Sequence, residues 1–485
     1  MENPTPVSSI GGEPAPLKLN VKRTMLIGFA FFGILLMWQV YDTYCSSFLS
    51  ELFMKAMGKT EAEDVQYLVG IIMAIDNIAA LIMMPIFGRL SDKTNTPLGK
   101  RMPYILVGTF VCAVAFPFIP LAFHFNNLAA LIVLMAITVF FAMMYRNPAV
   151  ALMPDLTPKP LRSKANGIIN IMGYLGGAVP SFLGMALVLS KYLGQGDPSW
   201  QTGNIWVIEI PFLLASVLMI ASVLVLFFTI KENKLARELA PELERGEAMA
   251  EVADSVANDD DDGAKMSKAN RTMLWLILIA EFFWYMADNG ISTFLVNYTR
   301  YYLQASTGSV SLTTIFSGVA SVIGFALAGF IVTKIGRKWT LSMGLLITLG
   351  AYAAWMIFGY AFPPAPVSGT ELNPFPIFLY IIFVLKGFGM GLVHVNSFPM
   401  VVELCSGKRV GRFTGYYYAS SMASQTVTPI LLGSLMLMPQ FSFRELPVYA
   451  VGCVLVSVVC FLFVKNIRSK KENIKTGLEA IGADD

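Results

Sequence analysis

Long apolar stretches separated by short polar ones run through almost the whole chain. About twelve of them are long enough to cross the ~30 Å hydrocarbon core of a bilayer as helices, which takes about 20 residues each. Their approximate limits are residues 24–49, 65–87, 103–123, 128–151, 166–190, 206–230, 272–302, 310–333, 339–362, 376–400, 414–438 and 446–466. The pattern predicts an all-α membrane protein with twelve transmembrane helices.

The polar connections between these stretches predict an orientation. The connection after the second stretch carries Arg89, Lys93, Lys100 and Arg101 against Asp92, whereas residues 124–127 carry almost no Lys or Arg. Later connections on the same side are also basic and contain Lys159, Arg162, Lys164, Lys334, Arg337, Lys338, Lys408, Arg409 and Arg412. Lys and Arg favour the cytoplasmic side of a membrane. We therefore expect both termini in the cytoplasm and the protein in the inner (plasma) membrane.

A segment of different composition divides the chain. Between about Lys231 and Ala269 the sequence is rich in charge and alanine and contains the acidic run from Asp259 to Asp262. Such a segment is typical of a solvated linker, here partly helical. The apolar stretches before and after it number about six each.

The two halves carry matching residues at one constant interval. Arg23-Thr24-Met25-Leu26 recurs as Arg271-Thr272-Met273-Leu274, and the same interval relates Gly88-Arg89 to Gly336-Arg337. It also relates Asp155-Leu156 to Glu403-Leu404 and Gly167 to Gly415. A fixed interval indicates a duplicated six-helix unit in parallel orientation. The predicted parts are a tail (1–23), a six-helix bundle (24–230), a linker (231–270), a second bundle (271–467) and a tail (468–485).

Composition narrows the class of protein. The chain has 485 residues, of which 55% are hydrophobic and 14% charged, and soluble domains have about 25% charged residues. No basic patch with interleaved aromatics indicates nucleic acid, and the five cysteines show no metal-ligand spacing. No nucleotide-binding loop or catalytic triad is visible either. We expect a membrane protein that is not an enzyme, has no cofactor or metal and acts as a monomer.

The second connection carries a family resemblance. Gly88-Arg89-Leu90-Ser91-Asp92 resembles the G-x-L-a-D signature of the major facilitator superfamily. Together with Gly99-Lys100-Arg101-x-Pro103 and Ala151-Leu152-x-x-Asp155-Leu156, it resembles the sucrose–proton symporters within the glycoside–pentoside–hexuronide:cation symporter group. The resemblance implies the major facilitator fold and proton-coupled symport of a sugar or glycoside, such as a disaccharide, by alternating access.

Two departures from the family pattern change this picture. Melibiose-type sodium symporters carry two carboxylates where this chain has Ala80 and Met84, which favours a proton over sodium. Plant sucrose carriers carry an arginine where this chain has Val150, which argues against sucrose itself as the substrate. The alternatives are a carrier or exporter of a non-sugar amphipathic solute on the same fold, and a transporter-like sensor without transport.

Ionisable residues inside the apolar stretches are the candidates for proton coupling. A charge at mid-bilayer costs about 3 kcal/mol on insertion scales, so it tends to face a water-filled cavity or a partner. We expect Asp42 and Asp76 to face a cavity and Asp76 or Asp288 to carry the proton. The proton-coupling set is Asp76, Asp288, Arg146, Glu281 and His394. The alternative is that these residues form permanent ion pairs that fix helix packing.

Aromatic and amide side chains near these charges suggest a sugar site. Aromatic faces pack on the apolar side of a sugar ring, and polar groups bind its hydroxyls. The predicted substrate-binding residues are Trp38, Tyr41, Asp42, Tyr44, Trp284, Asp288, Asn289, Lys386 and Gln425. Any one of the aromatics could instead pack against lipid.

Charged residues at the cytoplasmic ends of the stretches are candidates for a gate. An acid there could hold the two halves together against the amide groups at the start of the eleventh stretch, which carry partial positive charge. The predicted gating residues are Gly88, Asp92, Arg101, Asp155, Glu403 and Arg412. The alternative is that they only set the topology.

Overall fold

The computed structural model describes residues 17–187, 205–258, 268–365, 372–402, 404 and 410–465. Within these ranges the regular secondary structure is helical, apart from an isolated bridge between Ala305 and Asn373. The acidic run Asp259–Asp262, Glu403, Cys405 and most of both tails lie outside the described residues, as does the side chain of Arg412.

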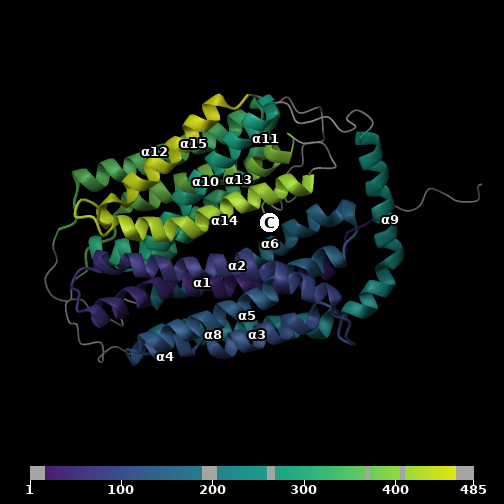
Figure 1. Ribbon diagram of the computed structural model, residues 1–485, viewed down its shortest axis with the longest axis horizontal. Helices are drawn as coiled ribbons and strands as arrows, with labels where there is room; N and C mark the ends of the chain where they lie inside the picture. Colours follow the sequence, from purple (N-terminus) through teal and green to yellow (C-terminus); the bar gives the residue numbers. More distant parts are fainter. Residues whose placement is uncertain are drawn as a thin grey trace, which may run out of the picture.

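The helices form two groups, one from each half of the chain (Figure 1). The first comprises α1 (Val21–Met57), α2 (Gln66–Lys93), α3 (Met102–Ala115), α4 (Phe118–His124), α5 (Leu128–Asp155), α6 (Arg162–Ala186) and α8 (Trp206–Thr229). The second comprises α10 (Lys268–Asn297), α11 (Gly308–Ile335), α12 (Arg337–Ala361), α13 (Ile377–Val402), α14 (Val410–Leu435) and α15 (Leu446–Phe463). Short helices are η1 (Ala62–Val65), η2 (Lys159–Leu161), the π-turn η3 (Tyr298–Tyr302) and η5 (Phe443–Glu445).

Each group buries its own hydrophobic core. One core cluster contains buried residues between Ile27 and Leu239, and another contains buried residues between Met273 and Val464 together with Ala62. The groups meet where α2 packs against α14 and where α6 packs against α11. Large apolar side chains also cover the outer surface, among them Val114, Phe330 and Ile381. An apolar exterior of this extent is expected of a protein whose solvent is lipid.

Eleven helices within the described ranges are long and apolar enough to span a membrane. The eleventh predicted stretch, 414–438, corresponds to α14, which is less apolar because it carries Ser420, Ser421, Ser424, Gln425, Thr426 and Thr428. It packs between α2 and α10 rather than facing lipid alone. The all-helical membrane fold is therefore confirmed.

Two predicted boundaries differ in the structure. The stretch 103–123 is divided into α3 and α4 at Pro117, which has no N–H to continue the helical hydrogen bonds. The segment Gly88–Asp92, expected in a loop, forms the last turns of α2, which continues to Lys93. The connection between α2 and α3 is thus shorter than the sequence indicated.

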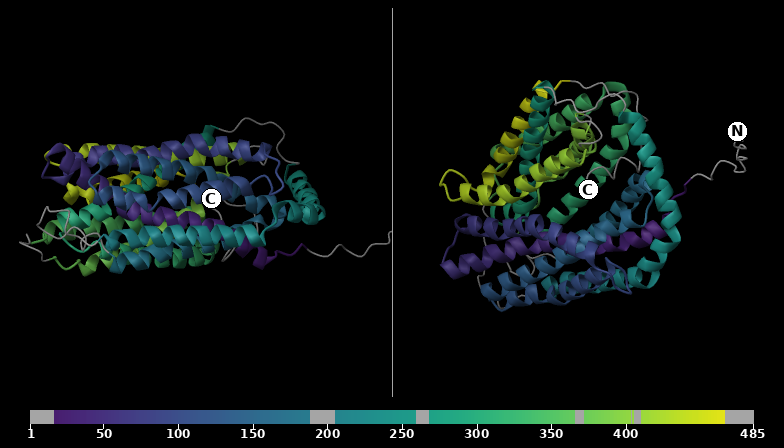
Figure 2. Two further views of the ribbon diagram at one scale, coloured as in Figure 1. Left: turned by 90° about the horizontal axis from the view of Figure 1, so that it is seen from below. Right: turned by 45° about the vertical axis from the view of Figure 1, so that its right-hand side comes forward.

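The linker contains one long helix, α9 (Glu232–Asn258). It lies across one end of the molecule, at a steep angle to the other helices (Figures 1 and 2). We refer to this end as the α9 end and to the opposite one as the far end. Helices α1 and α10 both begin at the α9 end and finish at the far end (Figures 1 and 2).

Candidate functional site

A cavity of about 250 Å³ lies between the two helix groups. Helices α1, α2 and α5 supply one wall, and α10 and α14 supply the other. Its lining residues are Leu35, Trp38, Asp42, Met73, Asp76, Asn77, Ala80, Met143, Arg146, Asn289, Ser292, Thr293, Gln425 and Pro429. Because both halves contribute, any relative movement of the halves changes the cavity.

Three charged side chains on the first wall define the electrostatics of the cavity. Asp42 comes from α1, Asp76 from α2 and Arg146 from α5. Asp42 is exposed, Arg146 is half-buried and Asp76 is 9% exposed. Two ionised carboxylates and one guanidinium carry a total charge of −1, so binding of one proton to either carboxylate makes the group neutral.

Uncharged polar groups complete the walls. Asn289, Ser292 and Thr293 occupy one face of α10, being three and four residues apart. On the opposite wall, the Asn77 side-chain amide donates to the Gln425 backbone carbonyl at 3.1 Å, a hydrogen bond between the halves. Trp38 adds an aromatic surface, which packs edge-on against Tyr41 with ring centroids 5.5 Å apart.

A second group of ionisable residues lies within the second half. Lys386 of α13 forms an ion pair with Asp288 of α10, and both side chains are largely buried. His394 lies next to Tyr285, with Nδ1 3.5 Å from the tyrosine hydroxyl. Glu281 on the same helix is fully buried. The candidates predicted for proton coupling are thus divided between the cavity and this cluster.

Three predicted substrate-binding aromatics do not line the cavity. Tyr41 is fully buried, and the Tyr44 hydroxyl donates to the Leu187 carbonyl at 2.6 Å. Trp284 is fully buried and packs near Phe461. Three smaller residues, which the sequence pattern did not indicate as binding residues, line the cavity instead: Asn77, Ser292 and Thr293. Ser292 and Thr293 lie one helical turn beyond Asn289, so helical spacing could have identified them.

Polar contacts join the halves on the far side of the cavity. Arg300 of η3 pairs with Glu51 of α1 at 2.5 Å, and the Tyr301 hydroxyl donates to the same carboxylate at 2.7 Å. The Asn297 amide oxygen accepts from Ser47 at 2.8 Å. Its nitrogen donates to Ser50 at 3.0 Å and to Gln66 at 3.1 Å. We call the residues Ser47, Ser50, Glu51, Gln66, Asn297, Arg300 and Tyr301 the far-end latch.

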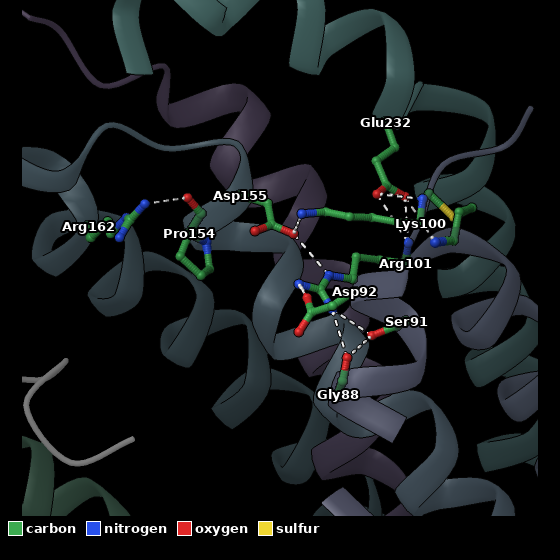
Figure 3. A network of polar contacts seen from close by, with 10 residues as sticks. Gly88, Ser91, Asp92, Lys100, Arg101, Pro154, Asp155, Arg162 and Glu232 are labelled. Atoms are coloured by element: carbon green, nitrogen blue, oxygen red, sulfur yellow. Dashed lines mark hydrogen bonds and ion pairs between the residues drawn. The ribbon is translucent and has the colours of Figure 1, made fainter. Parts of the chain in front are cut away.

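A further network occupies the α9 end (Figure 3). The Arg101 guanidinium donates through Nε to Asp155 at 2.9 Å and through Nη1 to Ser91 at 2.5 Å, and it also pairs with Asp92. Lys100 pairs with Asp155 at 3.0 Å. These residues belong to α2, α5 and the connection before α3, so the network ties together helices of a single half.

The partners in this network differ from those expected for a gate. Asp155 pairs with Lys100 and Arg101 of its own half, whereas a gate would need a partner in the other half. Arg162 instead donates to the backbone carbonyl of Pro154 at 2.9 Å (Figure 3). Burial lowers the pKa of the Arg101 guanidinium, but Asp155 and Asp92 raise it by more. The net pKa therefore lies above its ordinary value, and the side chain stays cationic.

Glu232, the first residue of α9, is attached to this network by the backbone (Figure 3). Its carboxylate accepts from the N–H groups of Lys100 at 2.9 Å, Arg101 at 3.1 Å and Met102 at 3.0 Å. These donors begin α3, where unpaired amides favour an anion. The linker helix is thereby fixed to the first half.

Comparison with known proteins gives a family match over most of the chain. The family model described as Major Facilitator Superfamily matches residues 27–361 and 277–482. No curated protein matches the sequence.

Solved transporters share the fold at low identity. The xylose transporter XylE from E. coli, in an inward open conformation, superposes with a TM-score of 0.61 at 18% identity, covering 96% of this chain and 99% of that one. The nucleoside transporter NupG gives 0.61 at 12% identity, covering 91% and 100%. A peptide transporter, POT, in complex with sulfate gives 0.59 at 15% identity, covering 91% and 93%. At these identities the similarity establishes the fold and leaves the substrate open.

Proposed function

The chain belongs to the Major Facilitator Superfamily of membrane transporters, and from this premise we propose that it is a symporter that couples transport of a sugar or glycoside to protons. The observation that carries the proposal is the set of Asp42, Asp76 and Arg146 around one cavity between the halves. Ionisable groups are costly inside a membrane protein, and a transport pathway is where they have a function.

The uncharged lining supports a sugar as the substrate. Trp38 offers a ring face, and Asn289, Ser292, Thr293 and Gln425 offer donors and acceptors for hydroxyl groups. The volume of about 250 Å³ is below the roughly 300–1,000 Å³ typical of sites for drug-sized ligands. In this conformation the cavity has room for one sugar ring, and a disaccharide would require a wider cavity.

The coupling step follows from the same residues. A proton binds to the carboxylate of Asp76, neutralising it, and leaves from that oxygen when the cavity opens to the other side. A cation close to a carboxylate favours its ionised form, so movement of Arg146 relative to Asp76 changes proton binding. In the second half, the Asp288–Lys386 pair is the alternative carrier, because separating the pair would leave Asp288 free to bind a proton.

Alternation of access is supported by the positions of the contacts between the halves. The far-end latch and the close backbone approach of Gly70 to Pro429 lie on one side of the cavity. We infer that this conformation is closed at the far end.

Basic residues such as Lys93, Lys159 and Lys334 follow or end helices at the α9 end. We propose that this end is cytoplasmic, in the inner membrane, with both termini on that side.

Uptake into proteoliposomes tests the proposal. A panel of mono- and disaccharides is supplied while the proton and sodium gradients are varied independently. We expect accumulation of a sugar that depends on the proton gradient alone. Dependence on sodium, transport of lysolipids instead of sugars, or tight binding without flux would each contradict it.

Variants separate the two candidate proton carriers. Asp76→Asn and Asp288→Asn each remove one carboxylate, and Asp64→Asn, at an exposed ion pair with Lys59, is the matched control. We expect sugar-driven proton uptake to be lost in one of the first two and kept in the control. Normal coupling in both would show that neither carboxylate carries the proton.

A further inference from the structure

A second pocket, of about 500 Å³, lies at the α9 end, away from the cavity between the halves. It is formed by the connection before α3, the end of α8 and the start of α9. Its lining residues are Pro97, Leu98, Met102, Phe227, Ile230, Lys231, Glu232, Asn233, Lys234, Arg237 and Glu238. None of these lines the cavity between the halves, so the pocket is a separate feature.

Hydrogen bonds hold the walls of this pocket in place. Besides the three N–H groups bound by Glu232, the Asn233 amide donates to the carbonyls of Thr96 at 2.8 Å and Pro97 at 3.0 Å. Gly99, which lies between Pro97 and Lys100 in the chain, has a φ of 121°. It packs so closely against Glu232 that a Cβ added at Gly99 would lie 2.1 Å from the Glu232 carboxylate oxygen. The connection is therefore clamped onto α9, and the pocket is a built feature of the fold.

The pocket lining carries a net positive charge, because the cations Lys231, Lys234 and Arg237 outnumber the carboxylates of Glu232 and Glu238. The Glu232 carboxylate is bound by backbone N–H groups, and Glu238 is paired with Lys234 at 3.7 Å. Lys231 and Arg237 then remain as cations without a carboxylate partner among the described residues. The Lys231 ammonium donates to the Phe227 carbonyl at 3.0 Å and lies 4.7 Å from the centre of that ring.

The pocket also has an apolar edge at the level of the membrane surface. The membrane-spanning helix α8 ends at Thr229, two residues before Lys231. Phe228 in its last turn is 67% exposed, and Leu98 across the pocket is 45% exposed. A ligand here meets hydrocarbon on one side and two cations on the other, which matches the boundary between lipid chains and headgroups.

We propose that this pocket binds the headgroup of an anionic phospholipid, with Lys231 and Arg237 contacting the phosphodiester. A planar guanidinium matches two phosphate oxygens, and an ammonium adds a point charge. The acyl chains extend past Leu98 and Phe228 into the bilayer. The lipid thereby touches both the connection before α3 and the linker helix.

Lipid retention by the purified full-length protein tests this assignment. The protein in detergent is titrated with phosphatidylglycerol, phosphatidylcholine or inorganic phosphate, and bound lipid is counted by native mass spectrometry. We expect phosphatidylglycerol to bind more tightly than phosphatidylcholine. The variant Lys231→Gln/Arg237→Gln is expected to weaken phosphatidylglycerol binding by on the order of thirtyfold, since each of the two cations near a membrane surface adds about 1 kcal/mol.

A matched variant distinguishes a pocket from general surface charge. Lys334→Gln/Lys338→Gln removes two cations at the same end of the molecule, where Lys338 lies 5.2 Å from the centre of the exposed Trp339 ring. This variant is expected to retain phosphatidylglycerol. An equal loss in both variants would overturn the proposal in favour of nonspecific attraction. Inorganic phosphate that displaces phosphatidylglycerol in full would overturn it in favour of a soluble phosphate ligand.

Discussion

Glu51 of α1 and Arg300 of η3 form an ion pair, 2.5 Å between oxygen and nitrogen, that joins the two halves at the far end. Their side chains are only 8% and 16% exposed. The pair exists only while the far end is closed, since one partner comes from each half. It therefore contributes to the balance between conformations as well as to stability.

Arg300→Gln tests the far-end latch. Removing one partner of a buried pair costs about 3 kcal/mol because the remaining charge is left desolvated. We expect the variant to shift the protein toward a conformation open at the far end. The measurement is the reactivity of Thr293→Cys, placed in the cavity of a variant in which the native cysteines are replaced by serine, toward a membrane-impermeant thiol reagent added from the far side.

The exposed pair Lys59–Asp64 provides the control for this measurement. It also lies at the far end, but its side chains are 45% and 43% exposed and both belong to the first half. Lys59→Gln should leave the labelling rate unchanged. Equal labelling of Thr293→Cys with and without Arg300→Gln would rule out a role for the pair in closure.

Gly70→Ala tests closure through backbone contact. A Cβ on Gly70 would lie 2.1 Å from the carbonyl oxygen of Pro429 in the other half, so the two backbones would have to separate. We expect the same increase in far-side labelling as for Arg300→Gln. Gly318→Ala is the control, because nothing lies within 4 Å of a Cβ there. An unchanged labelling rate in Gly70→Ala would show that α2 and α14 can adjust without opening.

Arg101→Lys tests the network at the α9 end. The guanidinium reaches Asp92, Asp155 and Ser91 together, and a lysine ammonium cannot span all three. We expect a loss of about 2 kcal/mol of stability, seen as a lower midpoint of thermal unfolding in detergent. The control variant Arg89→Lys, at an exposed arginine, should not change the midpoint of thermal unfolding. A midpoint unaffected by Arg101→Lys would mean that charge alone maintains the network.

Because the raised pKa keeps Arg101 charged, its contribution should not vary with pH between about 5 and 9. A group whose pKa is higher in the folded state than in the unfolded state stabilises the fold at pH values below its unfolded pKa. That stabilisation is lost only as the pH rises through the folded-state pKa. For an arginine that window lies above about 12. The difference in unfolding midpoint between the native protein and Arg101→Lys, measured across this range, is expected to be flat where the paired acids stay ionised. A marked decline toward pH 9 would contradict this.

Glu232→Gln tests the attachment of the linker helix. The carboxylate accepts from three backbone N–H groups, and an amide offers one oxygen and no charge to the start of α3. We expect a loss of about 1–3 kcal/mol and faster proteolysis of the linker. Glu238→Gln, whose side chain is 55% exposed, is the control and should behave like the native chain. Native-like proteolysis of Glu232→Gln would show that other contacts hold α9.

The sequence was most informative about features that depend on the hydrophobicity or charge of the residues themselves and not on which residues they contact. A stretch of about 20 apolar residues has few stable arrangements other than a helix in lipid, so the fold class could be read from the chain. The motif around Gly88 and Asp92 indicated the superfamily, which the family match establishes. Because a buried charge is costly in a membrane, the sequence also predicted functional positions for Asp42, Asp76 and Arg146, and these three residues line one cavity.

The partners of those residues were decided only by the tertiary structure. Glu51 and Arg300, or Glu232 and the amides before α3, are far apart in the chain, and no local pattern relates them. Rotation of each helix about its axis also turned Tyr41, Tyr44 and Trp284 into the protein and brought Asn77, Ser292 and Thr293 to the cavity. Helical rotation is set by packing against neighbouring helices, which a stretch that is apolar on every side does not specify. The sequence alone thus determined that this chain is a helical membrane transporter, and the packing of its helices determined which side chains meet.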